Sequence, residues 1–424
     1  MTRRRVGTSS APTPPATGRK HRPDYKLVLF SGLLVLIGVV VLFAISPYQI
    51  HRLNETGGQV SESHYMLKQT LYLAAGAAAF VAAAMIPLDV WRRYAGRVVV
   101  AAILICAMLA LLGAVHGPLA MCYNGACRWY DLGFLSFQPA ELLKFGLLLY
   151  AAVFLGRRMQ QNTVNSYSDT LLPIGLLVGI AALIVIGFQK DMGTGITIIG
   201  MLATMLFVAG LRYRLIVISG LIGLVIGIVF IVASPHRVAR ITTFVSSSNS
   251  PTDAASYHID MATLAIGSGG IVGRGLGNGV QAFGYLPEAL NDSIFAVLGE
   301  TFGFIGLLVI LGLFSALLKR LLDMIDRLSD PTMRLLVAGT FGWLATHVIV
   351  NIGAMTGLLP LTGVTLPFLS FGGTSLLFMM LALGMVNHIS QYTSHQMHER
   401  GHSDESSRSG RRLRGPRHTG SRSY

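Results

Sequence analysis

A few carboxylates lie within or beside long apolar stretches of this 424-residue chain, and these are the residues that can do chemistry. Asp292 lies in GYLPEALNDSIFAVLGE, where a long polar and glycine-rich segment meets an apolar stretch. A carboxylate at such a boundary can act as a general base when its surroundings raise its pKa. The structural alternative is that Asp292, together with Ser293, caps the helix that follows.

Three further acids have both a functional and a structural interpretation. Glu141 and Lys144, in SFQPAELLKFG, are three residues apart, so they lie on one helical face and can form an ion pair. Asp191, in QKDMGTG, is either a helix N-cap or a site residue. Glu300, in FAVLGETFGFIG, is surrounded by apolar residues and needs a basic partner, a hydrogen-bonding partner or a raised pKa.

The composition indicates which class of protein positions these residues. Hydrophobic residues make up 52% of the chain, charged residues make up 12%, and the mean hydropathy is +0.60. A soluble globular protein carries about 25% charged residues, so the composition excludes one and indicates a polytopic membrane protein. The net charge of +14 lies mostly in residues 1–26 and 393–424. This placement argues against nucleic-acid recognition and favours cytoplasmic tails that contact anionic membrane lipids.

Ten apolar stretches are long enough to cross a bilayer, which predicts an all-α polytopic membrane protein. They are 27–47, 67–87, 97–115, 138–156, 171–188, 193–210, 215–233, 293–318, 333–352 and 367–390. The connections after the second, fourth, sixth and eighth stretches are all basic, so these connections and both termini are predicted to be cytoplasmic. The predicted domains are disordered basic tails at 1–26 and 393–424 and a membrane domain at 27–392, with a large outer loop at 234–292.

Three cysteines are present, and they differ in their surroundings. Cys106 lies within the third apolar stretch and is expected to be a buried small apolar residue. Cys122 and Cys127 lie in MCYNGACRW on the predicted outer side. They either form a disulfide across this short loop or remain two free thiols in a packed loop.

The glycine-rich run GSGGIVGRGLGNG at 267–279 is not a nucleotide-binding motif. It contains neither GxGxxG nor a P-loop, so its glycines are expected to let the chain fold back at the membrane face. Arg274 within this run can contact a phosphate group. The twelve histidines form no metal-binding motif, and His236 and His258 in the outer loop are typical of solvated residues.

Four separated strings carry a resemblance to a known family. They are NGACRWYDLGFLSFQPAELLK, QKDMGTG, IGSGGIVGRGLGNGVQAFGYLPEALNDSIFAVLGE and NIGAMTGLLPLTGVTLPFLSFGGTS. With the ten stretches, they resemble the SEDS family of FtsW, RodA and SpoVE proteins over residues 27–392. The string GLGNGVQAFGYLPEA and the long polar N-terminal tail look more like the division members (FtsW) than the elongation members (RodA).

The resemblance implies a function, a location and partners. It implies a peptidoglycan glycosyltransferase in the cytoplasmic membrane at the division septum. Such an enzyme polymerises lipid II, an undecaprenyl-pyrophosphate-linked disaccharide-pentapeptide, at the outer membrane face. The implied partners are a class B penicillin-binding protein, which cross-links the new strand, and other divisome proteins. Two alternatives remain open: a lipid II flippase or transporter, and a catalytically weak divisome scaffold.

Matching the motifs position by position assigns the family's essential acid to Asp292. The matched residues that would support the site are Arg128, Trp129, Glu141, Lys144, Asp191, Glu288, Glu300 and Ser370. The chain departs from the family pattern close to these positions, which leaves room for a weakened or altered activity. The departures are Leu290, Asn291 and Ser293 around Asp292, Thr362 in place of a lysine, Lys190 in place of a proline, and Tyr257-His258 in place of a Tyr-Gln pair.

The chemistry of glycan polymerisation fits these residue types. A base must take the proton of the acceptor sugar hydroxyl while the pyrophosphate leaves, and Asp292 is the expected base. Cationic side chains, or a divalent cation such as Mg²⁺ or Mn²⁺, would stabilise the departing pyrophosphate. The cationic candidates on the outer side are Arg128, Lys190, Arg240 and Arg274. No ligands for a metal are assigned.

Overall fold

The computed structural model describes residues 22–55, 61, 63–115, 117–123, 126–232, 238 and 254–392. Among the residues singled out in the sequence, Arg240 and His236 lie outside these described ranges. So do all of the predicted C-terminal tail and residues 1–21 of the predicted N-terminal tail. The disorder predicted for the tails therefore stays a prediction.

Helices dominate the described chain, and each predicted apolar stretch coincides with one of them. The α-helices are α1 (Tyr25–Glu55), α2 (His64–Met85), α3 (Leu88–Ala114), α4 (Pro139–Gln160), α5 (Leu172–Ala182), α6 (Met192–Val208), α7 (Tyr213–Val232), α9 (Ala254–Ser268), α10 (Ile294–Arg327), α11 (Pro331–Met355) and α12 (Gly373–Ile389). The π-helical turns are η1 (Tyr167–Leu171), η2 (Leu183–Phe188) and η3 (Gln281–Tyr285), and the 3₁₀ turn is η4 (Ser390–Tyr392). The turns η1 and η2 flank α5, so the predicted stretch 171–188 is one continuous helical segment.

Within the described residues, eight helices are long and apolar enough to cross a membrane. They are α1, α2, α3, α4, the segment 167–188, α10, α11 and the segment from α12 to η4. The helix α6 is also apolar but has 17 residues. The predicted helical membrane fold is therefore confirmed, while the count of ten crossings stays a prediction.

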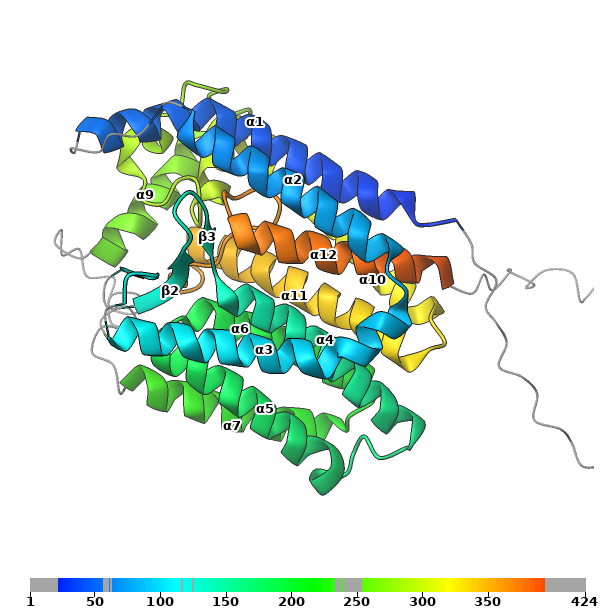
Figure 1. Ribbon diagram of the computed structural model, residues 1–424. Helices are drawn as coiled ribbons and strands as arrows, with labels where there is room; N and C mark the ends of the chain where they lie inside the picture. The colour runs from blue at the N-terminus through cyan, green and yellow to red at the C-terminus, as the bar shows by residue number, and fades with distance from the viewer. Residues whose placement is uncertain are drawn as a thin grey trace, which may run out of the picture.

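The spanning helices divide into central and peripheral ones. In α4, α11 and the α12 segment, 78%, 78% and 72% of the most apolar window is buried, whereas the other five candidate spans have 22–33% buried. Figure 1 shows α11 and α4 enclosed by the helices around them. Glu141 and Lys144, the predicted ion pair, both lie on α4 and therefore on a central helix.

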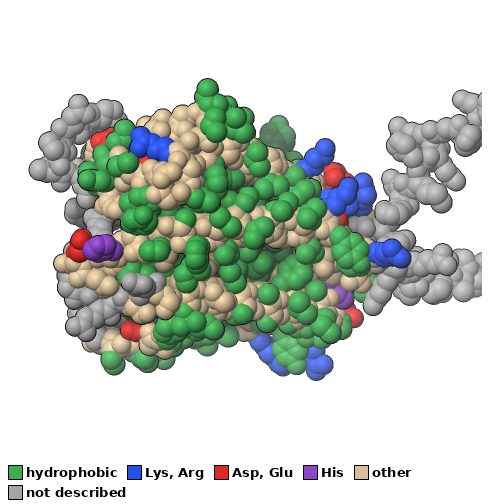
Figure 2. Space-filling view, turned by 90° about the horizontal axis from the view of Figure 1, so that it is seen from above, with side chains coloured by type: hydrophobic (Ala, Val, Ile, Leu, Met, Phe, Trp, Pro, Cys, Tyr) green, Lys and Arg blue, Asp and Glu red, His purple; other side chains and the backbone are tan. Residues whose placement is uncertain are grey.

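The peripheral helices present apolar side chains outwards. On α1, Leu29, Leu36 and Phe43 recur every seven residues and are 55%, 59% and 65% exposed. In Figure 2 hydrophobic side chains lie all across the face, between backbone and other side chains, and the charged side chains visible there lie mainly towards its ends. Such an uncharged face with many exposed apolar side chains is unfavourable in water and favourable against lipid tails.

A small sheet interrupts the helical fold, and the all-α prediction did not include it. Strands β1 (Ala120–Tyr123), β2 (Ala126–Asp131) and β3 (Ser136–Phe137) form an antiparallel sheet in that order. The Tyr130 hydroxyl donates to the Ile105 carbonyl at 2.9 Å and so ties the sheet to α3. Burial raises the pKa of the Tyr130 phenol, with a smaller contribution from Cys106, which keeps it a neutral donor.

The two ends of the helical bundle carry different features. The sheet and α9 lie at one end (Figure 1). At the opposite end, the Asp24 backbone N–H donates to the Ser390 hydroxyl at 3.0 Å, so the start of α1 and the end of the α12 segment meet. These are called the sheet end and the tail end below. The positive-inside rule predicts that the tail end faces the cytoplasm.

The outer cysteines form a disulfide, so the first of the two alternatives is the one observed. Cys122 and Cys127 are bonded and face each other as a pair of β1 and β2. The bond therefore joins the two strands next to Trp129, which pairs with Met121. Cys106 is buried and free, as predicted.

Removal of this disulfide is expected to lower the free energy of unfolding by about 2 kcal/mol, because the closed loop is short. The Cys122→Ser/Cys127→Ser variant should unfold at a lower denaturant concentration in detergent micelles. Reducing agent should shift the unfolding of the wild-type chain and leave that of the variant unchanged. Alkylation of both thiols in protein that has not been reduced would contradict the pairing.

The glycine-rich run folds back onto α10, while its predicted place at the membrane face stays a prediction. Gly303 breaks α10 with a φ of +65°, and residues 270–275 bond to the exposed backbone on both sides of the break. Phe304 donates to the Gly270 carbonyl at 2.9 Å, and Gly275 donates to the Thr301 carbonyl at 3.0 Å. A Cβ atom at Gly273 would overlap the α10 backbone, which explains why this approach needs glycine. The predicted outer loop thus contains helix α9 and the turn η3.

Candidate active site

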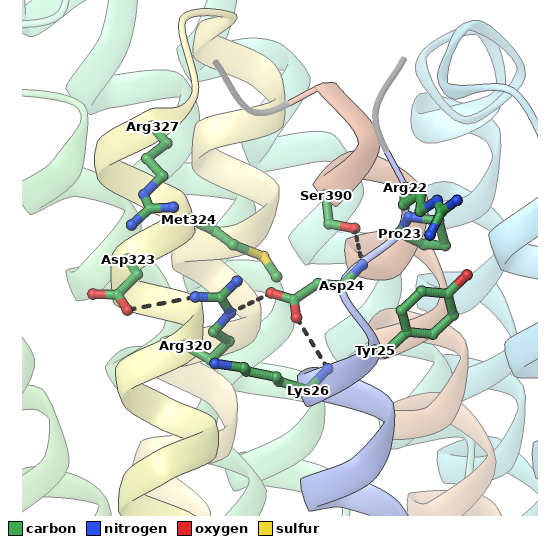
Figure 3. A pocket seen from close by; sticks show the side chains of 10 residues that line it. All are labelled: Arg22, Pro23, Asp24, Tyr25, Lys26, Arg320, Asp323, Met324, Arg327 and Ser390. Carbon is green, nitrogen blue, oxygen red and sulfur yellow. Dashed lines mark hydrogen bonds and ion pairs between the residues drawn. The ribbon is translucent and has the colours of Figure 1, made fainter. Parts of the chain in front are cut away.

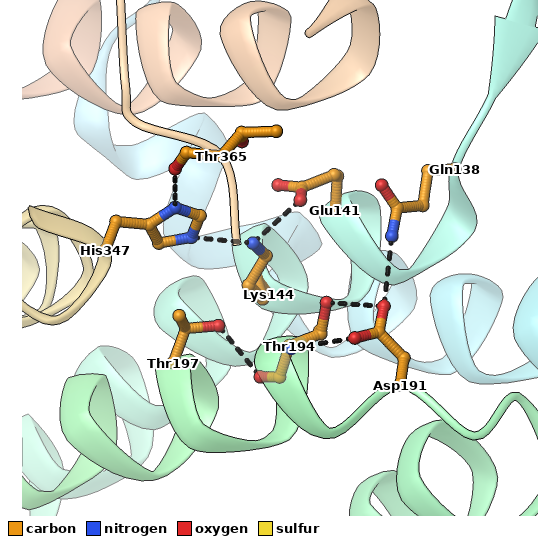
Figure 4. Close-up of polar contacts among 8 residues, drawn as sticks. All are labelled: Gln138, Glu141, Lys144, Asp191, Thr194, Thr197, His347 and Thr365. Atoms are coloured by element: carbon orange, nitrogen blue, oxygen red, sulfur yellow. Dashed lines mark hydrogen bonds and ion pairs between the residues drawn. The ribbon is translucent and has the colours of Figure 1, made fainter. Parts of the chain in front are cut away.

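The ion pair predicted on α4 is present and fully buried. The Lys144 ammonium lies 2.8 Å from a Glu141 carboxylate oxygen, and the two side chains are 1% and 4% exposed. Lys144 also donates to His347 Nε2 of α11 at 3.1 Å (Figure 4). The other ring nitrogen, Nδ1, lies 3.1 Å from the Thr365 carbonyl oxygen. Because that oxygen can only accept, Nδ1 carries the proton and Nε2 accepts from Lys144.

Asp191 caps α6, as one of its two interpretations predicted. One carboxylate oxygen accepts from the Thr194 backbone N–H at 3.0 Å. The other accepts from the Thr194 hydroxyl at 2.9 Å and from Gln138 Nε2 at 3.2 Å. Figure 4 shows Gln138 reaching Asp191 from the chain that leads into α4. The cap therefore joins the start of α6 to the start of α4.

Arg128 holds the chain just before Asp191. Its guanidinium donates to the Lys190 carbonyl at 2.7 Å and to the Gln189 carbonyl at 3.4 Å. Lys190 has a φ of +55°, and its side chain is exposed. The strand β2 thus positions a cation at the sheet end, directly beside the α6 cap.

Asp292 lies two residues before α10, and Asn351 of α11 holds its backbone. The Asn351 Nδ2 group donates to the Asp292 carbonyl and to the Val364 carbonyl, each at 2.7 Å. An Asp292 carboxylate oxygen lies 3.4 Å from where a Cβ of Gly363 would be. Gly363 is exposed and has a φ of +70°, so the carboxylate lies beside an exposed glycine of the segment 361–367.

Ser293 does not cap α10, so that part of the structural alternative is wrong. No capping hydrogen bond is made by the Ser293 side chain. Its hydroxyl instead donates to the Pro287 carbonyl at 2.8 Å and contacts His258 Nε2 at 2.6 Å. His258 was expected to be a solvated loop residue. It lies on α9 and bonds the residue next to Asp292.

The segment 361–367, between α11 and α12, is the element that brings the site together. Its Thr365 carbonyl accepts a hydrogen bond from His347, which in turn accepts from Lys144 of the buried ion pair. Its Val364 carbonyl and the Asp292 carbonyl both accept from the Asn351 side chain. Its Thr362 carbonyl lies 2.8 Å from where a Cβ of Gly193 would be, at the start of α6. The segment therefore contacts α11, Asp292 and the start of α6 near the sheet end, and His347 connects it to the ion pair on α4.

Three buried polar atoms around this segment have no hydrogen-bond partner among the described residues. They are Thr362 Oγ1, Glu141 Oε2 and Asn351 Oδ1. An unpartnered buried polar atom costs about 1–3 kcal/mol, so such atoms usually bind a water molecule, an ion or a ligand. Thr362 stands where the resembled family has a lysine, and its hydroxyl is one of the three.

Two of the predicted site residues, Glu300 and Ser370, hold the backbone of neighbouring segments in place. Glu300 is fully buried and accepts three backbone hydrogen bonds, from Val280 at 2.6 Å and from Gln281 and Ala282 at 3.0 Å each. It thereby anchors the turn η3, and its hydrogen-bonding partner is backbone rather than a basic side chain. The Ser370 hydroxyl accepts from the Leu366 N–H at 2.8 Å and shapes the end of the segment 361–367.

The remaining cationic and acidic candidates lie at the periphery. Arg274 donates from Nε to the Ser268 carbonyl at 3.1 Å, so its predicted phosphate contact stays a prediction. Glu288 has a φ of +48° and accepts from Asn291 Nδ2 at 2.6 Å. Trp129 is half-buried on β2. In the described ranges no group of three or more His, Cys, Asp or Glu residues could hold a metal ion.

His347, Asn351 and Gln138 belong to the site and were missed in the sequence. His347 and Asn351 are four residues apart in GWLATHVIVNIGAM, so they lie on one face of an otherwise apolar helix. Polar residues within a membrane-spanning helix usually face a partner or a cavity. Acidic residues within apolar stretches are the candidates considered in the sequence. The same criterion applied to neutral polar residues would also have selected His347 and Asn351.

Asn351→Leu is expected to lower an activity that depends on Asp292 by about tenfold to hundredfold, because it removes the donor that the Asp292 and Val364 carbonyl groups share. The substitution keeps the number and branching of the side-chain heavy atoms and removes both hydrogen bonds. Asn387→Leu, at a buried asparagine near the end of α12, is the matched control and should retain activity. Equal loss in both variants would contradict a positioning role for Asn351.

Comparison with known proteins finds relatives that match most of the chain. The chain is 34% identical over 378 residues to stage V sporulation protein E of Bacillus subtilis, covering 89% of this chain and 99% of that protein. It is 35% identical over 341 residues to a probable peptidoglycan glycosyltransferase FtsW of Coxiella burnetii, covering 78% and 87%.

Solved structures have the same fold. A chain from a study of the structural coordination of polymerization and crosslinking by a peptidoglycan synthase complex aligns with a TM-score of 0.70 and 26% identity, covering 88% of this chain and 99% of that one. The rod shape determining protein RodA of Thermus thermophilus aligns with a TM-score of 0.61 and 26% identity, covering 87% and 96%. The family model of the FtsW, RodA and SpoVE cell cycle proteins matches residues 25–395, and the chain belongs to this family of multi-pass membrane proteins.

Proposed function

We propose that this protein is a peptidoglycan glycosyltransferase that polymerises lipid II at the outer face of the cytoplasmic membrane, with Asp292 as its general base. The observation that carries the proposal is the clamp at Asn351, which holds Asp292 and the segment 361–367 together at the sheet end. The carboxylate lies beside exposed Gly363, where an acceptor hydroxyl can reach it.

Two cationic residues at the sheet end support the second half of the reaction. The pyrophosphate that leaves lipid II carries negative charge, which positive groups stabilise. Arg128 and Lys190 lie next to Asp191, at the start of the helix that contacts the segment 361–367. We infer that these two residues face the pyrophosphate, alone or together with a divalent cation such as Mg²⁺ or Mn²⁺.

The relatives suggest a partner and a place of action. The structure of highest similarity reported above comes from a peptidoglycan synthase complex. We infer that the chain acts with a class B penicillin-binding protein, and with other divisome proteins at the division septum. A polymerase that extends strands at the outer face requires such a cross-linking partner to join them to the wall.

Polymer formation separates this proposal from its alternatives. Purified full-length chain with its transpeptidase partner, supplied with lipid II in detergent or liposomes, should yield long glycan strands on a denaturing gel. A flippase would move labelled lipid II across the liposome membrane and leave it unpolymerised. A scaffold would do neither, so the absence of polymer from a folded complex would overturn the proposal.

A further inference from the structure

A cavity of about 520 Å³ opens at the tail end, opposite to the candidate active site. It lies between the start of α1, the last turns of α10 and Ser390 after α12 (Figure 3). Its volume is in the range of cavities that hold small-molecule ligands. The charged side chains that line it are Arg22, Asp24, Lys26, Arg320, Asp323 and Arg327.

The two acids of this cavity are both paired with one arginine. Arg320 forms an ion pair with Asp24 and lies 3.9 Å from Asp323. Asp24 also accepts from the Lys26 backbone N–H at 3.1 Å. Four basic and two acidic side chains line the cavity, so a formal excess of two positive charges remains. The basic side chains that line the cavity besides Arg320 are Arg22, Lys26 and Arg327.

The surroundings of the cavity point to a lipid rather than to a dissolved anion. Directly after Lys26, the outer face of α1 is apolar, with Val28 and Leu29 39% and 55% exposed. Tyr25, which lines the cavity, is 67% exposed, and tyrosine favours the boundary between membrane and water. A lipid whose anionic headgroup lay in the cavity would therefore place its acyl chains along the apolar face of α1. Basic pockets between spanning helices at the cytoplasmic side bind anionic lipid headgroups.

We propose that this cavity binds the phosphate-bearing headgroup of an anionic phospholipid of the inner leaflet, with Arg22, Lys26 and Arg327 as its cationic contacts. The bound lipid would join α1 to α10 at a point where Arg320 and Asp24 already connect them. This site is at the other end of the bundle from Asp292, so the proposal is independent of the polymerising function.

The test uses a photoactivatable phosphatidylglycerol incorporated into nanodiscs with the purified full-length chain, followed by mass mapping of labelled peptides. Label is expected on residues 22–26 and 320–327. Each basic side chain near the surface contributes about fivefold to anionic lipid binding, so Arg22→Gln/Lys26→Gln/Arg327→Gln should reduce labelling about a hundredfold. The double variant Arg22→Gln/Lys26→Gln, which changes two exposed residues only, should reduce it about 25-fold.

A matched pair of arginines outside the cavity provides the control. Arg157 and Arg158 end α4 at the same end of the bundle, and Arg157→Gln/Arg158→Gln should leave the labelling of 22–26 and 320–327 unchanged. An equal loss in this control would mean that the whole basic surface attracts lipid, and it would overturn the proposal. Displacement of the label by millimolar glycerol 3-phosphate would assign the site to a dissolved phosphate and would equally overturn it.

Discussion

Asp292→Asn is expected to lower the rate of lipid II polymerisation by about 10²–10⁴-fold, the usual contribution of a general base. Asparagine has nearly the same shape as aspartate and cannot take a proton from the acceptor hydroxyl. The clamp from Asn351 uses the backbone carbonyl of residue 292, so the substitution leaves that hydrogen bond in place. The lost activity would then reflect the missing base rather than a displaced segment.

A second carboxylate at the same end of the molecule supplies the control. Asp260 lies on α9, is exposed, and accepts a long hydrogen bond of 3.4 Å from the Ser256 hydroxyl. Asp260→Asn removes the same charge and should retain polymer yield on the gel. Wild-type yield in Asp292→Asn, with the variant folded and bound to its partner, would remove Asp292 from the mechanism.

The elements that could be predicted from the sequence are those whose signal is local. Long apolar runs predicted each spanning helix, because a helix in lipid must bury its backbone hydrogen bonds within one continuous segment. The Glu141–Lys144 pair was predicted because a spacing of three residues places both side chains on one face of α4. The Asp191 cap follows in the same way from its position at the start of α6.

The features that escaped prediction depend on contacts between distant parts of the chain. The sheet is built from strands of two to six residues, which are too short for an alternating pattern. The Glu300 carboxylate accepts hydrogen bonds from backbone N–H groups 18 to 20 residues earlier in the chain. Every residue except proline has such a group, so the sequence does not indicate which residues will donate. Likewise, the segment 361–367 contacts His347 and Asn351 through its backbone carbonyl groups. Every residue has a carbonyl group, so the sequence does not mark this segment as part of the site.

Lys144→Met is expected to lower the free energy of unfolding by about 3–5 kcal/mol, because it leaves the Glu141 carboxylate buried without its partner. Glu141 and Lys144 are among the most enclosed charged side chains of the described residues, and the ammonium also lies 5.1 Å from the Trp343 ring centre. Denaturant unfolding in detergent micelles measures the loss. Lys319→Met, at an exposed lysine of α10, should change stability by less than about 0.5 kcal/mol.

The double variant Glu141→Leu/Lys144→Met separates stability from activity. Replacing both partners of a buried ion pair by apolar residues is often neutral, so most of the stability lost in Lys144→Met should return. Polymerisation should nevertheless stay about tenfold below that of the wild type. His347 Nε2 loses its donor, and the imidazole that bonds the Thr365 carbonyl is no longer held from both sides. The segment 361–367 then keeps Asn351, while its second side-chain anchor, His347, is held less firmly, which loosens the chain beside Asp292. Full recovery of both stability and polymer yield would instead assign the buried pair to the fold alone.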